Sequence, residues 1–120
     1  MIAQRSLRVG IIGYGKIGKI RHECVRRNPA LMLMGICDFE QILPQDGFGV
    51  YQDYKILLDA KPDLVFICTF NRFIPEIAIE AIKRGIHVFS EKPAGRTLAD
   101  VEAIREVSFN NRKVKVKYGF

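Results

Sequence analysis

The chain has 120 residues, which suits a single domain, and its 48% hydrophobic and 27% charged content is ordinary for a globular protein. No apolar run approaches the roughly 20 residues of a membrane span, and the N-terminus lacks the apolar segment of a signal peptide, so a cytoplasmic protein is expected. The net charge of +6, from 19 basic and 13 acidic residues, is spread without a nucleic-acid-binding module, so neither nucleic acid nor membrane is an expected partner.

The first half of the chain predicts two strands and one helix. Apolar runs make Leu7–Ile12 and Leu31–Cys37 buried strands, and a helix covers Lys16–Arg27 between them. The stretch 39–49, which contains a proline and two glycines, is predicted to be irregular. Within the helix, an apolar stripe at helical spacing is expected to pack on the sheet: Ile17, Ile20, Cys24 and Val25.

The second half continues the alternation of helix and strand. The predicted elements are a helix at 53–59, a strand at 64–68, a helix at 75–84, a strand at 86–90, a helix at 97–109 and a strand at 114–120. Thr97 and Asp100 resemble a capping box at the start of the last helix. Such alternation predicts an α/β fold, a doubly wound parallel sheet of at least five strands with helices on both faces.

The three cysteines, Cys24, Cys37 and Cys68, are odd in number and widely spaced, without a C-x-x-C pair. This pattern argues against a disulfide framework and against a zinc site, so no metal is expected. Each cysteine lies in an apolar stretch, which favours the role of a small buried hydrophobic residue, with a catalytic thiol as the alternative.

A glycine motif follows the first strand directly: Gly13-Tyr14-Gly15-Lys16-Ile17-Gly18. In such a G-x-G-x-x-G loop the first glycine allows a tight turn, the second lets the backbone approach a pyrophosphate, and the third lets the helix pack closely. The helix N-terminus then faces the phosphates. The motif therefore indicates a Rossmann-type fold with a dinucleotide bound at residues 13–18, although a glycine turn used only for packing is the alternative.

Asp38 strengthens the dinucleotide interpretation. It lies 20 positions beyond Gly18, at the end of the second strand, where a carboxylate accepts hydrogen bonds from the adenosine ribose. The carboxylate would repel a 2′-phosphate, and the next residues, 39–42, contain no Arg or Lys to receive one. NAD is therefore favoured over NADP. The alternative for Asp38 is a solvated acid at a strand end.

Three blocks of sequence resemble the N-terminal domain of the glucose-fructose oxidoreductase, inositol dehydrogenase and rhizopine-catabolism (Gfo/Idh/MocA) family of oxidoreductases. They are residues 8–18, residues 62–69 with the continuation to Asn71, and residues 85–93, which end in Glu91-Lys92-Pro93. The resemblance covers nearly the whole chain, and the Glu-Lys-Pro block is its most specific part. Two positions depart from the family, because Phe70 replaces a proline and Ile74 stands where a histidine is common.

The resemblance implies roles for residues at the ends of the third and fourth predicted strands. Lys92 would lie beside the nicotinamide and the substrate as the catalytic, proton-handling group, and Glu91 would contact the nicotinamide ribose. Thr69, Phe70 and Asn71 would line the cofactor crevice, since ligands bind beyond the carboxyl ends of parallel strands. Phe70 packing on a ligand and Phe70 as a core or rim aromatic both remain open.

The resemblance also implies the function and the domain organisation. Residues 1–120 would form the NAD-binding domain of an oxidoreductase that transfers hydride between NAD(H) and a sugar, cyclitol or related polyhydroxy substrate. Family enzymes carry a second, substrate-binding domain that this chain lacks, so the isolated domain is not expected to turn over substrate. The alternative functions are a non-catalytic NAD-sensing module and an assembly module.

Alternating residues mark the last predicted strand as half-exposed. Lys113, Lys115 and Lys117 alternate with Val114 and Val116. Lysines of this kind protect a sheet edge from pairing with other chains. Alternatively, the missing domain or a second copy of the chain covers the edge, so a homo-oligomer remains an open interpretation.

Overall fold

The computed structural model describes residues 6–38, 47–69, 72–91 and 97–118. Ten elements follow one another along these residues: β1 (Leu7–Ile12), α1 (Lys16–Arg27), β2 (Leu31–Cys37), β3 (Gly49–Tyr51), α2 (Tyr54–Asp59), β4 (Leu64–Ile67), α3 (Ile74–Lys83), β5 (His87–Ser90), α4 (Leu98–Phe109) and β6 (Val116–Tyr118). All strand pairs are parallel, and the strand order is β3-β2-β1-β4-β5-β6. This confirms the predicted doubly wound α/β fold.

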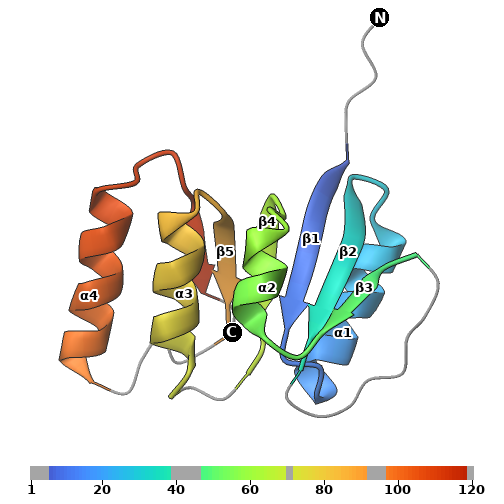
Figure 1. Cartoon of the computed structure of the whole chain (residues 1–120), viewed down its shortest axis with the longest axis horizontal. Coiled ribbons are helices and arrows are strands. Elements are labelled where there is room, and N and C mark those ends of the chain that lie inside the picture. Colours follow the sequence, from blue (N-terminus) through green and yellow to red (C-terminus); the bar gives the residue numbers. More distant parts are fainter. Residues whose placement is uncertain (1–5, 39–46, 70–71, 92–96, 119–120) are drawn as a thin grey trace, which may run out of the picture.

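Helices lie on both faces of the sheet, as Figure 1 shows. Helix α1 packs behind β1, β2 and β4, whereas α2 and α3 pack on the opposite face and α4 lies against α3. The Thr97–Asp100 capping box at the start of α4 is confirmed. Both faces of the central strands are therefore covered, as their near-continuous apolar runs predict. Among the described residues, no helix combines the length and apolar character that a membrane span requires.

Strand β3 was not predicted: its first residue, Gly49, ends the stretch expected to be irregular, and residues 50–51 were assigned to no element. Its three residues pair in parallel with the end of β2, from Gly35 opposite Gly49 to Cys37 opposite Tyr51. A three-residue strand is too short to show an alternating pattern, and its first residue is a glycine, which has low strand propensity. The strand exists because the end of β2 offers backbone groups that need partners.

The helical face of α1 was also predicted wrongly. Ile17 and Ile20 are 41% and 47% exposed, and Cys24 is exposed as well, whereas Gly18 and Val25 are buried. Only Val25 of the expected stripe faces the sheet. The helix is thus rotated so that the positions around 18, 21 and 25 point inward.

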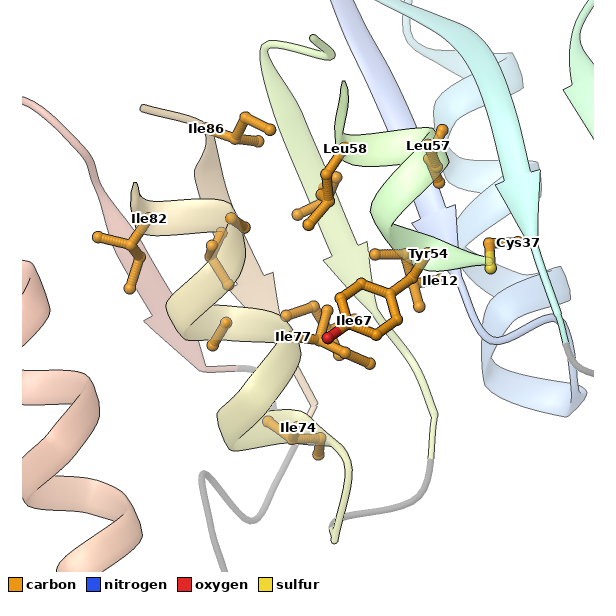
Figure 2. Packing of buried hydrophobic residues seen from close by; sticks show 14 of the residues in the cluster. Ile12, Cys37, Tyr54, Leu57, Leu58, Ile67, Ile74, Ile77, Ile82 and Ile86 are labelled. Carbon is orange, nitrogen blue, oxygen red and sulfur yellow. The ribbon is translucent and has the colours of Figure 1, made fainter. Parts of the chain in front are cut away.

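The main core lies between the sheet and the layer formed by α2 and α3. Figure 2 shows Leu57, Leu58 and Tyr54 of α2 beside isoleucines from the strands and α3. Leu57 is fully buried and sits over Gly35 of β2, where an added Cβ would lie only 2.8 Å from its Cδ1 atom. A glycine in the strand therefore makes the space that the leucine fills.

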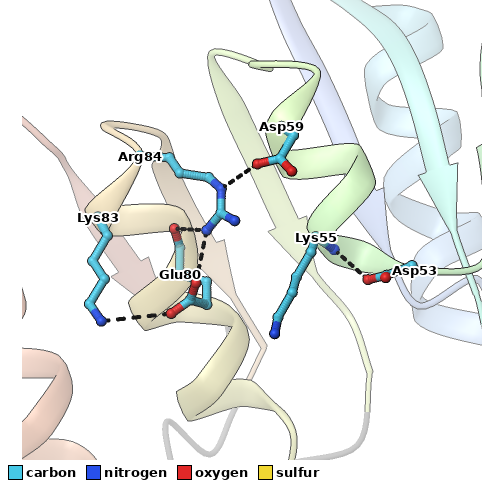
Figure 3. Close-up of polar contacts among 6 residues, drawn as sticks. All are labelled: Asp53, Lys55, Asp59, Glu80, Lys83 and Arg84. Atoms are coloured by element: carbon cyan, nitrogen blue, oxygen red, sulfur yellow. Dashed lines mark hydrogen bonds and ion pairs between the residues drawn. The ribbon is translucent and has the colours of Figure 1, made fainter.

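A polar cluster fastens α2 to α3 at the surface. The Arg84 guanidinium contacts Asp59 at the end of α2 (2.9 Å) and Glu80 on α3 (3.0 Å), and Lys83 lies 3.7 Å from Glu80 (Figure 3). Asp53 caps α2 by accepting a hydrogen bond from the Lys55 amide at 2.9 Å. Because Asp59 is well exposed, this pair adds little stability, and the buried residues dominate the packing of α2.

Replacing Leu57 with alanine should test whether buried residues, rather than surface ion pairs, hold α2 on the sheet. We expect Leu57→Ala to lower the free energy of unfolding by about 2–5 kcal/mol, because it leaves a cavity over the sheet. The matched control is Ile56→Ala, since Ile56 is adjacent on α2 but 57% exposed; it should change stability by less than about 0.5 kcal/mol. Urea unfolding followed by circular dichroism measures both, and equal effects would contradict the proposed packing.

Candidate functional site

A cleft of about 340 Å³ opens at the carboxyl ends of β1, β2 and β4. It is lined by Ile12, Gly13, Tyr14, Gly15, Lys16, Ile17, Cys37, Asp38, Tyr54, Cys68 and Thr69. After β1 the chain continues to β2 on one side, while β4 pairs with β1 on the other side. The cleft therefore lies where the strand order reverses, which is the usual ligand position in an open α/β sheet.

The glycine loop, residues 13–18, packs closely against the end of β4 and the start of α1. Gly13 has a φ of 94°, and a Cβ there would lie 2.7 Å from the backbone of Cys68 and Thr69. A Cβ on Gly18 would lie 2.0 Å from the Gly13 carbonyl oxygen. Both positions exclude any larger residue. A Cβ on Gly15, by contrast, would meet no described atom within 4 Å, so the middle of the loop faces open space.

The N-terminus of α1 is suited to an anion. Gly15 is the N-cap residue and provides no side-chain cap, and the first turn contains no acidic residue. The first amides of a helix have no intrahelical acceptor, and the helix dipole adds positive potential there. Lys16, the first residue of α1, also lines the cleft and adds a cation.

Asp38 joins the glycine loop to the end of β2. Its Oδ2 atom accepts a hydrogen bond from the Tyr14 amide at 2.5 Å, and its own amide donates to the Tyr51 carbonyl at 3.1 Å. Strand β3, absent from the sequence prediction, thus helps to hold this residue in place. A carboxylate has about four acceptor sites, so a hydrogen bond to Tyr14 is compatible with further donors from a ligand.

Backbone hydrogen bonds continue past the strand ends and align the residues around the cleft. The Gly13 amide donates a hydrogen bond to the Cys37 carbonyl, and the Cys68 amide donates one to the Ile12 carbonyl, both at 2.7 Å. The Glu91 amide donates to the Ile67 carbonyl at 3.0 Å. The sites predicted after four separate strands, β1, β2, β4 and β5, therefore lie along the same carboxyl-terminal side of the sheet. Phe70, Asn71 and Lys92 lie outside the described residues, as do residues 39–42.

Glu91 is held by a residue that the sequence analysis did not select. Both of its carboxylate oxygens accept hydrogen bonds from Arg21 of α1, and the shortest contact is 2.9 Å. No local sequence pattern selects Arg21, because the packing of α1 decides that it lies on the inward face between Gly18 and Val25. A cation on such a face requires a partner.

Two further side chains were missed. Tyr54 of α2 lines the cleft, and burial, followed by the nearby Glu76 carboxylate, raises the pKa of its hydroxyl. His22 forms a 2.7 Å hydrogen bond between its Nδ1 atom and the Tyr14 hydroxyl, and its ring packs edge-on against Phe48. These contacts anchor the Tyr14 ring beside the glycine loop.

The cysteines differ in environment. Burial is the main cause that raises the pKa of both Cys37 and Cys68 to about 12, with neighbouring carboxylates contributing. Cys37 is buried, Cys68 is half-buried and Cys24 is exposed, so the expectation that all three are buried is confirmed for Cys37 and wrong for Cys24. Within the described part of the chain, no cluster of three His, Cys, Asp or Glu residues could hold a metal ion.

Fold and cleft together define a Rossmann-type dinucleotide-binding domain. Residues 7–120 match the family described as "Oxidoreductase family, NAD-binding Rossmann fold", and the chain belongs to this family. The resemblance noted in the sequence is therefore confirmed.

The relatives of the chain include dehydrogenases of sugars and inositols. The chain is 36% identical over 118 residues to D-glucoside 3-dehydrogenase of Escherichia coli, covering 90% of this chain and 32% of the relative. It is 32% identical over 107 residues to myo-inositol 2-dehydrogenase of Thermotoga maritima, covering 83% of this chain and 32% of that protein. The chain thus spans about a third of the length of these relatives.

Solved structures of inositol dehydrogenases superpose closely on this chain. The scyllo-inositol dehydrogenase of Lactobacillus casei with bound NAD(H) and scyllo-inositol superposes with a TM-score of 0.87 at 25% identity, covering 96% of this chain and 36% of that chain. The myo-inositol 2-dehydrogenase of Lactobacillus plantarum gives a TM-score of 0.88 at 27% identity, covering 96% of this chain and 36% of that chain.

The thiol environments make a prediction about pH and reactivity. At pH 8 a thiol-specific reagent should label the exposed Cys24 fastest, the half-buried Cys68 more slowly and the buried Cys37 slowest. Since the folded pKa of Cys37 and Cys68 is about 12, above the ordinary value of 9.0, the unfolded chain ionises first as pH rises. Their contribution to stability is therefore complete below pH 9 and is lost between pH 9 and 12.

Urea unfolding at a series of alkaline pH values measures this loss. A Cys37→Ala/Cys68→Ala variant should show a shallower decline of unfolding free energy with pH than the parent chain. Three thiols that react at one rate in the folded protein would contradict the assignment.

Proposed function

We propose that this chain forms the NAD-binding part of an oxidoreductase that transfers hydride between NAD(H) and a sugar, cyclitol or similar polyhydroxy compound. The single observation that carries the proposal is the cleft at the strand reversal, where the open side of the glycine loop, the N-terminus of α1 and Asp38 meet. The names of the relatives support the substrate class, because they include glucoside and inositol dehydrogenases.

The described residues fit a dinucleotide. The pyrophosphate would occupy the open space beside Gly15, where a side chain would stand in any other residue, and would meet the first amides of α1 and the Lys16 cation. The adenosine ribose would lie at Asp38, with its hydroxyls donating to the carboxylate. Thr69 would line the same crevice from the end of β4.

NAD is proposed over NADP because of the charge at Asp38. A 2′-phosphate on the adenosine ribose would meet the Asp38 carboxylate, and two anions at contact distance repel each other. The absence of Arg and Lys from residues 39–42 of the sequence supports the same preference.

The nicotinamide ring, when bound, accepts or donates the hydride, and the protein positions the reactants and handles the proton. We assign proton transfer to Lys92, with Glu91 at the nicotinamide ribose and Phe70 and Asn71 near the ring. This assignment rests on the family resemblance and on the position of Glu91 directly after β5. Contacts to the substrate would come from a second domain.

A cytoplasmic location and a homo-oligomer also belong to the proposal. Lys115 and Lys117 are exposed on or beside β6 in the described part of the chain, and exposed lysines oppose strand-to-strand pairing at this position.

Cofactor titration tests the binding role. Isothermal titration should show NAD and NADH binding to the chain, and NADP binding more weakly. Asp38→Ala should weaken NAD binding about tenfold, as expected for hydrogen bonds to a charged group, and should reduce the preference over NADP. Glu102→Ala removes an exposed acid on α4 and serves as the control, with unchanged affinities. A chain that binds no dinucleotide would refute the proposal.

Turnover tests the catalytic role of Lys92. In a form of the enzyme that oxidises a polyhydroxy substrate, Lys92→Ala should lower kcat by about 10²–10⁴-fold, the usual contribution of general acid–base catalysis. Pre-steady-state measurement of NADH formation would show whether the chemical step itself is slowed. An unchanged rate of that step would remove Lys92 from the mechanism.

A further inference from the structure

The ion pair between Arg21 and Glu91 joins two parts of the molecule that are 70 residues apart in sequence. Arg21 lies on α1, the helix that follows the glycine loop, and Glu91 lies immediately after β5. The Arg21 Nε atom donates to Oε2 at 3.1 Å, and the Nη2 atom donates to Oε2 at 2.9 Å and to Oε1 at 3.3 Å. Both carboxylate oxygens of Glu91 are therefore engaged from one side.

The guanidinium itself is fixed in orientation. Its central carbon lies 5.0 Å from the centre of the Phe89 ring, and that ring packs edge-on against Phe66 at 5.4 Å. A planar guanidinium combines stacking on an aromatic ring with a two-pronged contact to a carboxylate, which a lysine ammonium does not. Arg21 is thus held by β5 at the same time as it holds Glu91.

Glu91 is fixed through both its backbone and its side chain. Its amide donates to the Ile67 carbonyl of β4, and its side chain is only 16% exposed. The pair also lies near the wall of the cleft: the charge of Glu91 adds to the raised pKa of the Cys68 thiol, and the charge of Arg21 opposes it. The two charges therefore act close to where a ligand would bind.

Stability alone is a poor explanation for this pair. A partly buried ion pair often contributes little net stability, because removing two charges from water offsets their attraction. Helix α1 is already packed on the sheet through Gly18 and Val25, which are buried. What the pair does specify is the direction of the Glu91 carboxylate, whose charge is felt by Cys68 in the cleft lining.

We infer that Arg21 is a positioning residue for the nicotinamide half of the cofactor, acting through Glu91. By binding both carboxylate oxygens from the side of α1, it directs the remaining acceptor sites of Glu91 toward the nicotinamide ribose and fixes the start of the Glu91-Lys92-Pro93 block. This inference rests on the proposed function, since it assumes that NAD occupies the cleft.

The test compares NAD with ADP, which lacks the nicotinamide riboside. Isothermal titration on the full chain should show that Arg21→Ala weakens NAD binding about tenfold and changes ADP binding less than twofold, as expected when a charged group is no longer held. Arg21→Lys keeps the charge without the two-pronged contact and should recover only part of the affinity. Arg26→Ala, which removes an exposed arginine paired with Glu23 on the same helix, is the control and should change neither affinity.

A double-variant comparison shows whether Arg21 acts through Glu91. In a Glu91→Gln background, Arg21→Ala should cause little further loss of NAD affinity, because the carboxylate it orients is already gone. Additive losses would overturn the inference, and so would equal losses for NAD and ADP or an unchanged Arg21→Ala variant that folds. A parent chain that binds neither NAD nor ADP would instead refute the proposed function.

Discussion

The close contact between the first turn of α1 and the Gly13 carbonyl constrains the rest of the site. A Cβ on Gly18 would lie 2.0 Å from that oxygen, so the helix approaches the loop at a distance that only glycine permits. This contact fixes both where α1 begins and how it is rotated. The positions one and two turns after Gly18, around Arg21 and Val25, must then face the sheet.

The fold and the positions of the glycine motif and Asp38 could be predicted from the sequence. The G-x-G-x-x-G spacing and Asp38 depend on local backbone geometry and on the order of elements, so they could be recognised without coordinates. The alternation of strand and helix likewise gave the parallel sheet, because such a chain has few other ways to bury its apolar runs. Asp38 was expected at the end of β2 and lies there, 2.5 Å from the Tyr14 amide.

The predictions from the sequence were wrong where the rotation of a helix, or a contact between positions far apart in the sequence, determines which residues meet. Ile17, Ile20 and Cys24 form an apolar stripe, but the contact of Gly18 turns another face of α1 inward. Strand β3 forms only because β2 offers an edge to it. The contact of Arg21 with Glu91 joins positions 70 residues apart, and no local pattern encodes it.

Helix α1 consequently contributes both to the cleft and to the contact with Glu91 at the end of β5. Its N-terminus and the glycine loop form the end that suits phosphates, while its inward face carries Arg21 to the end of β5. Because one helix links these points, the distance between the proposed phosphate site and Glu91 depends on how α1 packs on the sheet. A substitution that moves α1 away from Gly13 would displace its N-terminus and Arg21 together. The contacts made by Gly18 and Arg21 are therefore coupled through the helix.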